Sequence, residues 1–233
     1  MRPRLLNGLI AAGALLSIAA SPWALNQGAL LFVCKPLTTL LIIVYAWPRG
    51  ADAPAARRAL RTGLLLSLAG DVALLWPQQG FVPGLVAFLL AHVAYIVAFT
   101  RSHRFLVQPA ALTAYAAAAG AVLALLWPSI PAALRVPVAC YVLALTAMSA
   151  QTAVVGLSAR GAAQPRARLL MLGGALFMLS DALLATNRFA LPLPAATLWI
   201  LATYWAAQWC IASWLEPTPA LPSVAAPRGG SAG

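Results

Sequence analysis

Long apolar runs separated by short polar loops dominate this chain. A helix that crosses the hydrocarbon core of a membrane needs about 20 mainly apolar residues. Stretches of roughly that length cover residues 5–21, 29–47, 61–76, 81–99, 109–127, 134–157, 168–186 and 195–215. Because alternation of period two is absent, the pattern predicts an all-α, polytopic transmembrane helical bundle of about eight spans. The third span is short at its apolar core, so we expect it to start among arginines.

The composition agrees with a membrane protein. Hydrophobic residues make up 63% of the chain, charged residues 8%, and the mean hydropathy is +0.88. Soluble domains are typically about 45–50% apolar and about 25% charged. We therefore expect one integral membrane domain over residues 1–216, in the inner membrane of a bacterial cell. Residues 217–233 are rich in Pro, Ala and Gly and are predicted to form a disordered tail.

The net charge of +11 reflects membrane topology rather than nucleic-acid binding, because the basic residues sit in short clusters between apolar runs. Only Arg135 and Arg188 fall on one side of the predicted membrane, and all other arginines fall on the opposite side. Both termini are therefore predicted to be cytoplasmic. The segment up to Ser21 also resembles a cleavable signal peptide, and its removal would leave seven spans with the same orientation.

Motifs for metal or nucleophilic catalysis are absent from the sequence. There is no GxSxG, HExxH or GxxxxGK[ST] pattern, and His92 is the only histidine inside a predicted span. The cysteines Cys34, Cys140 and Cys210 lie in apolar segments without CxxC spacing, so we expect buried free thiols. No metal ion, cofactor or nucleic-acid partner is predicted.

Charged residues inside the predicted spans are the most informative feature. The chain has four acidic residues, and two of them, Asp71 and Asp181, lie in apolar segments, as does the only lysine, Lys35. A charge at the bilayer centre costs about 2.5–3.5 kcal/mol on insertion scales, so such residues commonly mark functional sites. The topology places all three in the outer half of the bilayer, where they could meet in one pocket. The structural alternatives are a Lys35 that extends to the interface and aspartates that only fix helix packing.

Helical spacing places small residues beside these charges. Gly63, Ser67 and Gly70 share a face with Asp71, and Gly173, Phe177 and Ser180 share one with Asp181. Small residues allow close helix approach and shield the charge from lipid. An aromatic stripe on the fourth span is expected to be mainly core: Phe88, His92, Tyr95 and Phe99. Residues 70–75 also resemble residues 180–185, which is a weak sign of a repeat of four plus four spans.

Five short motifs occur in order along the predicted spans. They are Lys35-Pro36-Leu37-Thr38-Thr39-Leu40-Leu41, Gly70-Asp71-Val72-Ala73-Leu74-Leu75, Phe88-Leu89-Leu90-Ala91-His92-Val93-Ala94-Tyr95, Phe177-Met178-Leu179-Ser180-Asp181-Ala182-Leu183-Leu184-Ala185 and Tyr204-Trp205-Ala206-Ala207-Gln208. Together they resemble the YhhN-type lysoplasmalogenase family of eight-span membrane proteins. The resemblance covers nearly the whole chain except the tail.

The resemblance implies a hydrolase that cleaves the vinyl ether bond of lysoplasmalogens, giving a fatty aldehyde and glycerophospho-ethanolamine or -choline. Its partners would be a lysophospholipid substrate and the membrane lipids. Asp71 and Asp181 would be catalytic. The conserved polar positions of the family map in addition to Lys35, His92, Tyr95, Tyr204 and Gln208, which would bind substrate or support the site.

Two acidic side chains suit this chemistry. Vinyl ether hydrolysis begins with protonation of carbon and passes through an oxocarbenium ion, a state that glycosidases also handle with two carboxylates. If Lys35 paired with one aspartate, that one would stay ionised and the other could act as the acid. Alternatively, Lys35 could bind the lipid phosphate. A proton-coupled lipid or solute carrier, or a structural protein with buried charges, remains the alternative function.

Overall fold

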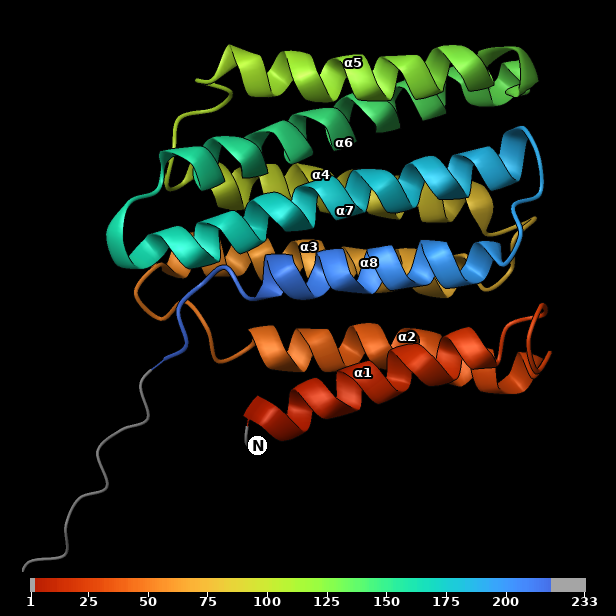
Figure 1. The fold of residues 1–233 in the computed structure, drawn as a ribbon, viewed down its shortest axis with the longest axis horizontal. Helices are drawn as coiled ribbons and strands as arrows, with labels where there is room; N and C mark the ends of the chain where they lie inside the picture. Colours follow the sequence, from red (N-terminus) through yellow and green to blue (C-terminus); the bar gives the residue numbers. More distant parts are fainter. Residues whose placement is uncertain (1–2, 219–233) are drawn as a thin grey trace, which may run out of the picture.

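The structure is a computed structural model that describes residues 3–218. Within them the chain forms eight α-helices (Figure 1). They are α1 (Pro3–Ala19), α2 (Gly28–Ala46), α3 (Pro54–Ala73), α4 (Phe81–Thr100), α5 (Pro109–Leu126), α6 (Ala132–Ser158), α7 (Gln164–Phe189) and α8 (Ala196–Ala212). Short 3-10 turns, Trp127–Ser129 and Gly161–Ala163, precede α6 and α7. The predicted tail, 217–233, lies outside the described residues from 219 onward.

Each predicted span coincides with a helix, and the largest difference is at the start of the third. Helix α3 begins at Pro54, before the arginine cluster rather than within it. Proline favours the first helical turn because its missing N–H group would have no partner there, and the alanines that follow favour helix strongly. Helix α7 likewise begins with Gln164 and Pro165, earlier than the apolar run alone predicted.

The all-α membrane bundle is confirmed. Five segments of the described chain are long and apolar enough to cross a membrane: α2, α4, α5 with its 3-10 turn, α6, and α7 with its 3-10 turn. Helix α1 is apolar but shorter, and α3 carries Arg57, Arg58 and Arg61 in its first half. The crossing of the membrane by all eight helices therefore stays a prediction.

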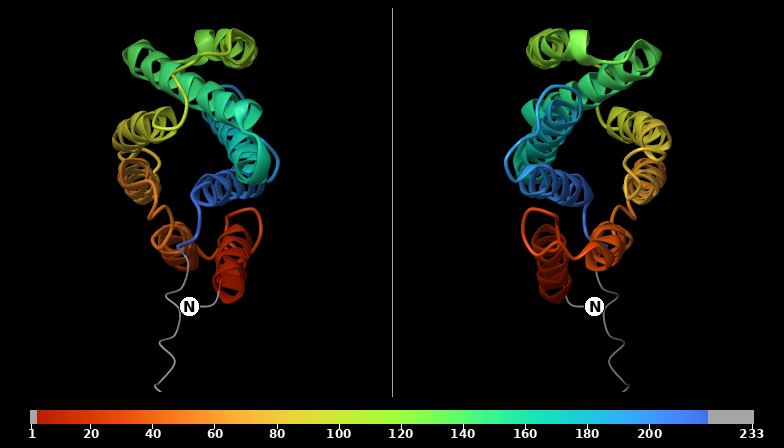
Figure 2. Two further views of the ribbon diagram at one scale, coloured as in Figure 1. Left: turned by 90° about the vertical axis from the view of Figure 1, so that its left-hand side faces the viewer. Right: turned by 90° about the vertical axis from the view of Figure 1, so that its right-hand side faces the viewer.

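Six helices form a closed ring. In order around it, α2, α3, α4, α6, α7 and α8 each pack against the next, and α8 returns to α2. Helix α1 lies outside against α2 and α8, and α5 lies outside against α6 and α7, as the end-on views in Figure 2 show. Most packing pairs of the first four helices recur in the last four, which agrees with the repeat suggested by the sequence.

Glycines permit close packing where α3 meets α4. A Cβ atom on Gly63 would overlap the ring of Tyr95, and one on Gly70 would lie 2.5 Å from the ring of Phe88. Real Cβ atoms do not approach other atoms so closely, so a larger residue would push these rings away. The prediction that small residues beside Asp71 allow close helix approach is confirmed.

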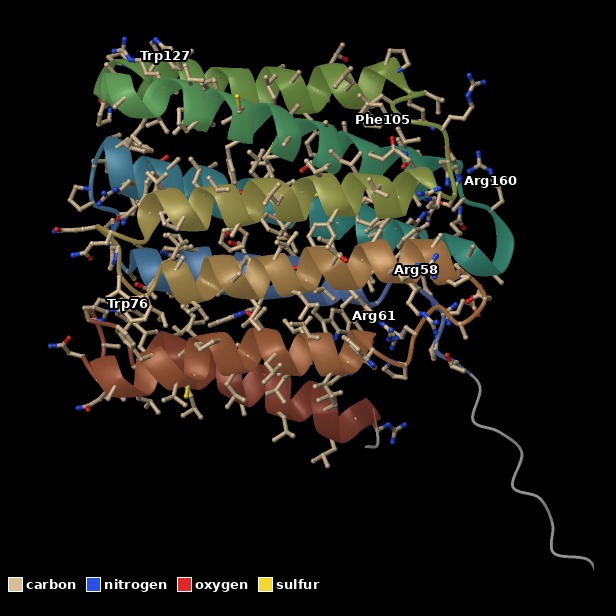
Figure 3. The ribbon with its side chains drawn as sticks, turned by 180° about the vertical axis from the view of Figure 1, so that it is seen from behind. Arg58, Arg61, Trp76, Phe105, Trp127 and Arg160 are labelled. Carbon is tan, nitrogen blue, oxygen red and sulfur yellow. The ribbon has the colours of Figure 1, made fainter. Side chains whose placement is uncertain are left out.

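The two ends of the bundle differ in charge. Figure 3 shows Arg58, Arg61 and Arg160 at one end, with Trp76 and Trp127 at the other. This segregation is what the topology rule for cytoplasmic loops describes. It supports the predicted orientation, in which the end with Trp76 and Trp127 is the outer one.

The cysteines are free, as predicted, but they are not all buried. Cys34 and Cys210 are buried, whereas Cys140 is exposed on α6. The prediction was wrong for Cys140 because an apolar segment of a membrane bundle also has a face turned outward. Such a face contacts lipid rather than other helices.

Candidate active site

Asp71 is buried and firmly held. Its side chain is 2% exposed. The hydroxyl of Thr39 on α2 donates a hydrogen bond of 2.6 Å to Asp71 Oδ2, and the hydroxyl of Tyr204 on α8 donates one of 2.7 Å to the same atom. Three helices therefore fix this carboxyl group.

A second layer of hydrogen bonds supports these donors. Trp205 Nε1 donates to Thr39 Oγ1 at 3.2 Å, and Gln208 Nε2 donates to the Tyr204 hydroxyl at 3.1 Å. The Tyr95 hydroxyl on α4 donates to Gln208 Oε1 at 2.7 Å. Tyr95, Tyr204 and Gln208, which the sequence singled out, thus form one chain of bonds that ends at Asp71. All three side chains are buried.

Asp181 has a different environment. The hydroxyl of Tyr141 on α6 donates a hydrogen bond of 2.6 Å to Asp181 Oδ2. It is the one hydrogen bond that Asp181 receives from a side chain in the described chain, and Asp181 is partly exposed. This carboxyl group therefore has fewer donors and more open space than Asp71.

Both aspartates line one polar cavity of about 390 Å³. Its other polar lining residues are Lys35, Ser180, Asn187, Arg188, Thr197 and Tyr204. Within residues 3–218 the one ion pair joins Arg166 to Glu216, so Lys35 forms no direct ion pair with either aspartate. The pairing considered from the sequence is absent, and Lys35 instead shares the cavity with both acids.

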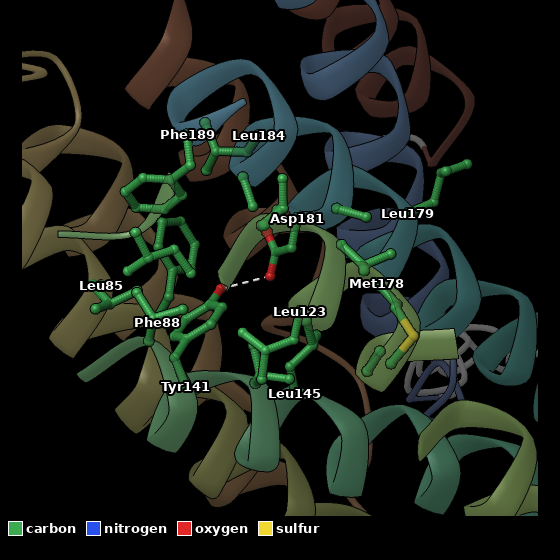
Figure 4. Close-up of a pocket in the computed structure, with 18 of the residues that line it drawn as sticks. Leu85, Phe88, Leu123, Tyr141, Leu145, Met178, Leu179, Asp181, Leu184 and Phe189 are labelled. Atoms are coloured by element: carbon green, nitrogen blue, oxygen red, sulfur yellow. Dashed lines mark hydrogen bonds between the residues drawn. The ribbon is translucent and has the colours of Figure 1, made fainter. Parts of the chain in front are cut away.

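A second cavity, of about 310 Å³, lies beside the first and is apolar. Side chains of α4, α5, α6 and α7 line most of it, as Figure 4 shows. Among its lining residues, only Tyr141 and Asp181 carry strong hydrogen-bonding groups. Asp181 lines this apolar cavity as well as the polar cavity.

His92 does not line either cavity. Its ring is buried between Tyr141 and Phe177, with ring centroids 5.1 and 4.9 Å away. Neither ring nitrogen has a hydrogen-bond partner in the described structure. The aromatic stripe of α4 is mainly core, as predicted, although Phe88 lines both cavities.

Sequence reasoning missed two residues that hold the aspartates. Tyr141 lies in an apolar stretch of α6 outside every motif. A polar hydroxyl in that apolar stretch was the only feature of the sequence that could have marked it as a partner of an aspartate. Thr39 lies within the Lys35 motif, but nothing in the sequence set it apart from Thr38. In the structure Thr38 donates to its own helix, at Cys34 O, whereas Thr39 points to Asp71.

Metal ligands do not gather in the part of the chain that the structure describes. No group of three His, Cys, Asp or Glu side chains is placed to hold a metal ion there. The site's chemistry consists of two carboxyl groups, their hydroxyl donors, and the cations Lys35 and Arg188.

Comparison to known proteins identifies the family of this chain. A sequence model of the YhhN family matches residues 28–215, which include all eight helices except α1. The chain belongs to the YhhN family. The family resemblance seen in the five motifs is therefore confirmed.

Several curated relatives of this YhhN protein are named lysoplasmalogenase. The human protein named Lysoplasmalogenase TMEM86B is 40% identical over 64% of this chain and 59% of its own length. Human Lysoplasmalogenase TMEM86A is 35% identical over 78% of this chain and 75% of its own length. The protein named Lysoplasmalogenase from Mycobacterium bovis is 33% identical over 65% of this chain and 58% of its own length. No solved structure matches this chain.

Proposed function

We propose that this YhhN protein is a membrane hydrolase that cleaves the vinyl ether bond of lysoplasmalogens. The single observation that carries the proposal is the pair of aspartates with unequal surroundings lining one cavity inside an apolar helical bundle. The names of the relatives support the same reaction. The products would be a fatty aldehyde and a glycerophospho-ethanolamine or -choline.

The reaction needs an acid that can protonate carbon. Proton transfer to the second carbon of the alkenyl chain gives an oxocarbenium ion shared by the first carbon and the ether oxygen. Water adds to the first carbon, and the resulting hemiacetal breaks its bond to the glycerol oxygen. One substrate and one water thus give one aldehyde and one free glycerol hydroxyl, with no oxidant or cofactor.

Asp181 suits the role of the acid. It lies where the apolar cavity meets the polar cavity, so an alkenyl carbon can reach it without leaving apolar surroundings. Its single side-chain donor, Tyr141, bonds to Oδ2, which leaves Oδ1 to carry the proton. An apolar environment with few donors favours the neutral form of a carboxyl group.

Asp71 suits the role of the carboxylate. Burial opposes ionisation of Asp71, whereas two hydroxyl donors at Oδ2 and the nearby Lys35 favour its ionised form, and we assign it that form. In this role Asp71 stabilises the oxocarbenium ion and takes a proton from the attacking water. When the hemiacetal breaks, Asp71 returns this proton to the glycerol oxygen, and the hemiacetal hydroxyl reprotonates Asp181. Both aspartates then regain their starting states.

An assay of aldehyde release tests the proposal. Purified protein is supplied with a detergent-dispersed 1-alkenyl lysophospholipid, and the saturated 1-alkyl analogue serves as the inert control. We expect aldehyde from the alkenyl lipid only, with losses of about 10²–10⁴-fold in D71N and D181N, the range typical of general acid–base groups. Asp52, which is exposed in the loop before α3, supplies the matched control D52N.

Two outcomes would contradict the proposal. Full turnover in D71N or D181N removes that aspartate from the mechanism. Lipid uptake into proteoliposomes without any aldehyde favours the carrier function instead. A loss of turnover supports the proposal only in a variant that elutes as the same species as the parent protein, so that misfolding is not mistaken for lost chemistry.

A further inference from the structure

The apolar cavity adjoins the site, and the proposed chemistry uses only the edge of it that Asp181 lines. It is lined by Leu85, Val122, Leu123, Leu145 and other apolar side chains. Its volume of about 310 Å³ lies at the lower end of the roughly 300–1,000 Å³ typical of small-molecule sites. A cavity of this size and character suits one hydrocarbon chain.

The apolar cavity adjoins the polar cavity. Both are lined by the same five residues: Leu74, Phe81, Phe88, Asp181 and Leu184. Two adjoining cavities of opposite character match a molecule with one apolar and one polar part. Asp181 is the one shared residue that carries a charge-bearing group, and it lies at the junction.

The polar cavity presents two cations to such a molecule. Lys35 and Arg188 both line it, and neither forms an ion pair within the described chain. Arg188 sits 5.1 Å from the ring centroid of Phe81, one of the residues shared by the two cavities. Cations on this lining are suited to a phosphate group.

We propose that the apolar cavity holds the single hydrocarbon chain of an ether lysophospholipid whose phosphate binds Lys35 and Arg188. The bond between chain and headgroup then lies beside Asp181. The identity of this lipid rests on the proposed function, but the position of its chain and phosphate does not depend on turnover. Helix α5 lines the outer side of the cavity, so its inner face limits the length of chain that fits.

Helix α5 offers a matched pair of substitutions. Leu123 lines the apolar cavity, whereas Leu125 is 80% exposed on the outside of the same helix. L123W fills the cavity, and L125W adds the same ring to the outer face. We expect L123W to weaken binding of a long-chain 1-alkyl lysophospholipid at least tenfold and to shift the preferred chain to a shorter one. L125W should bind as the parent protein does.

The phosphate site is tested with two lipids that differ only in the headgroup. The parent protein should bind a 1-alkyl lysophospholipid more tightly than the 1-alkylglycerol of equal chain length. R188Q and K35Q should remove most of that preference. R135Q is the control, because Arg135 is also on the outer side but stacks on Trp127, with 5.4 Å to the ring centroid.

Binding of the saturated ether lipid is measured by calorimetry or fluorescence in one detergent, on variants that keep the thermal stability of the parent. Equal effects of L123W and L125W would overturn the chain site, and equal binding of the two lipids by the parent would overturn the phosphate site. Aldehyde release unaffected by L123W would also contradict the chain site while leaving the proposed function intact. Normal binding without aldehyde from the alkenyl lipid would contradict the proposed function alone.

Discussion

Asp71 and Asp181 occupy equivalent places in the two halves of the bundle but have unlike surroundings. Each receives a hydroxyl from the helix before its own, Thr39 for Asp71 and Tyr141 for Asp181. Asp71 gains a second donor, Tyr204, and is buried, whereas Asp181 faces two cavities. This difference in surroundings is the basis on which we propose Asp71 as the base and Asp181 as the acid.

The helices that supply these hydroxyls are also alike. Helix α2 has Pro36 inside it, one turn before Thr39, and α6 has Pro137 inside it, one turn before Tyr141. Opposite them the halves diverge. Helix α8 contributes Tyr204 to Asp71, while α4 contributes His92, whose ring packs on Tyr141 rather than bonding to Asp181. The difference between the two sites therefore comes from the last helix of each half.

The largest effects are expected from substitutions of the two aspartates. Their variants should differ from each other in stability rather than in turnover. Both D71N and D181N should lose about 10²–10⁴-fold in turnover. The alanine variants of the two aspartates should differ more in stability than the asparagine variants do. D71A leaves the buried hydroxyls of Thr39 and Tyr204 without an acceptor, and each unsatisfied buried group costs about 1–3 kcal/mol. D181A leaves only the hydroxyl of Tyr141 without an acceptor, and this hydroxyl lies beside a cavity.

Thermal unfolding in detergent measures this difference. D71A should unfold at a clearly lower temperature than D181A, whose midpoint should lie close to that of the parent. Equal midpoints for the two alanine variants would show that the network around Asp71 does not hold it more firmly.

A smaller effect is expected from removing one donor at each site. Y141F deletes the one side-chain hydrogen bond to Asp181, which becomes charged as it donates its proton. A bond to a charged group is worth about 1.5–3 kcal/mol, or roughly 10–100-fold in rate. Y204F leaves Asp71 its bond from Thr39, so its turnover should fall less. Steady-state rates of aldehyde release compare the two variants. A greater loss of turnover in Y204F than in Y141F would contradict this ranking of the two hydroxyl donors.

Packing at Gly70 supplies a prediction of intermediate size. G70A places a Cβ atom against Phe88, which lines both cavities, so the ring must shift. Overpacking of this kind costs about 1–3 kcal/mol. We expect lower stability and weaker binding of long-chain ether lipid. A methyl group added at Gly120 would meet no neighbour within 4 Å, so G120A is the control and should match the parent in both measurements.

The smallest effect should come from Tyr95. Y95F removes the bond to Gln208, which reaches Asp71 only through Tyr204. Interhelical hydrogen bonds in membrane proteins average about 0.6 kcal/mol, so turnover should fall only about threefold. A loss as large as that of D71N, measured in the same aldehyde assay, would mean that Tyr95 acts on the substrate directly.

Much of the fold could be predicted from the sequence because spans in a membrane must be long, apolar and helical. Loop charges and helical rise also predicted that Lys35, Asp71 and Asp181 could meet in one pocket, and all three line the polar cavity. Hydrogen-bond partners could not be predicted in the same way, since they depend on how the helices rotate and pack. For this reason the sequence did not point to Tyr141. For the same reason it did not predict that Lys35 forms no ion pair with an aspartate within residues 3–218.

His92 illustrates the same limit. Its position in a motif pointed to the site, but its rotation on α4 places it behind Tyr141 instead of in a cavity. The two cavities were also beyond sequence reasoning, because each is formed by side chains from several helices.

The most direct test of the mechanism is the fate of the proton that Asp181 donates. The parent protein and D181N are given a 1-alkenyl lysophospholipid in D₂O, and the aldehyde is reduced at once to the alcohol so that its label cannot exchange. We expect one deuterium on the second carbon of the chain, formed rapidly by the parent and about 10²–10⁴-fold more slowly by D181N. Alcohol without deuterium at that carbon, or equal rates for the two proteins, would contradict the mechanism.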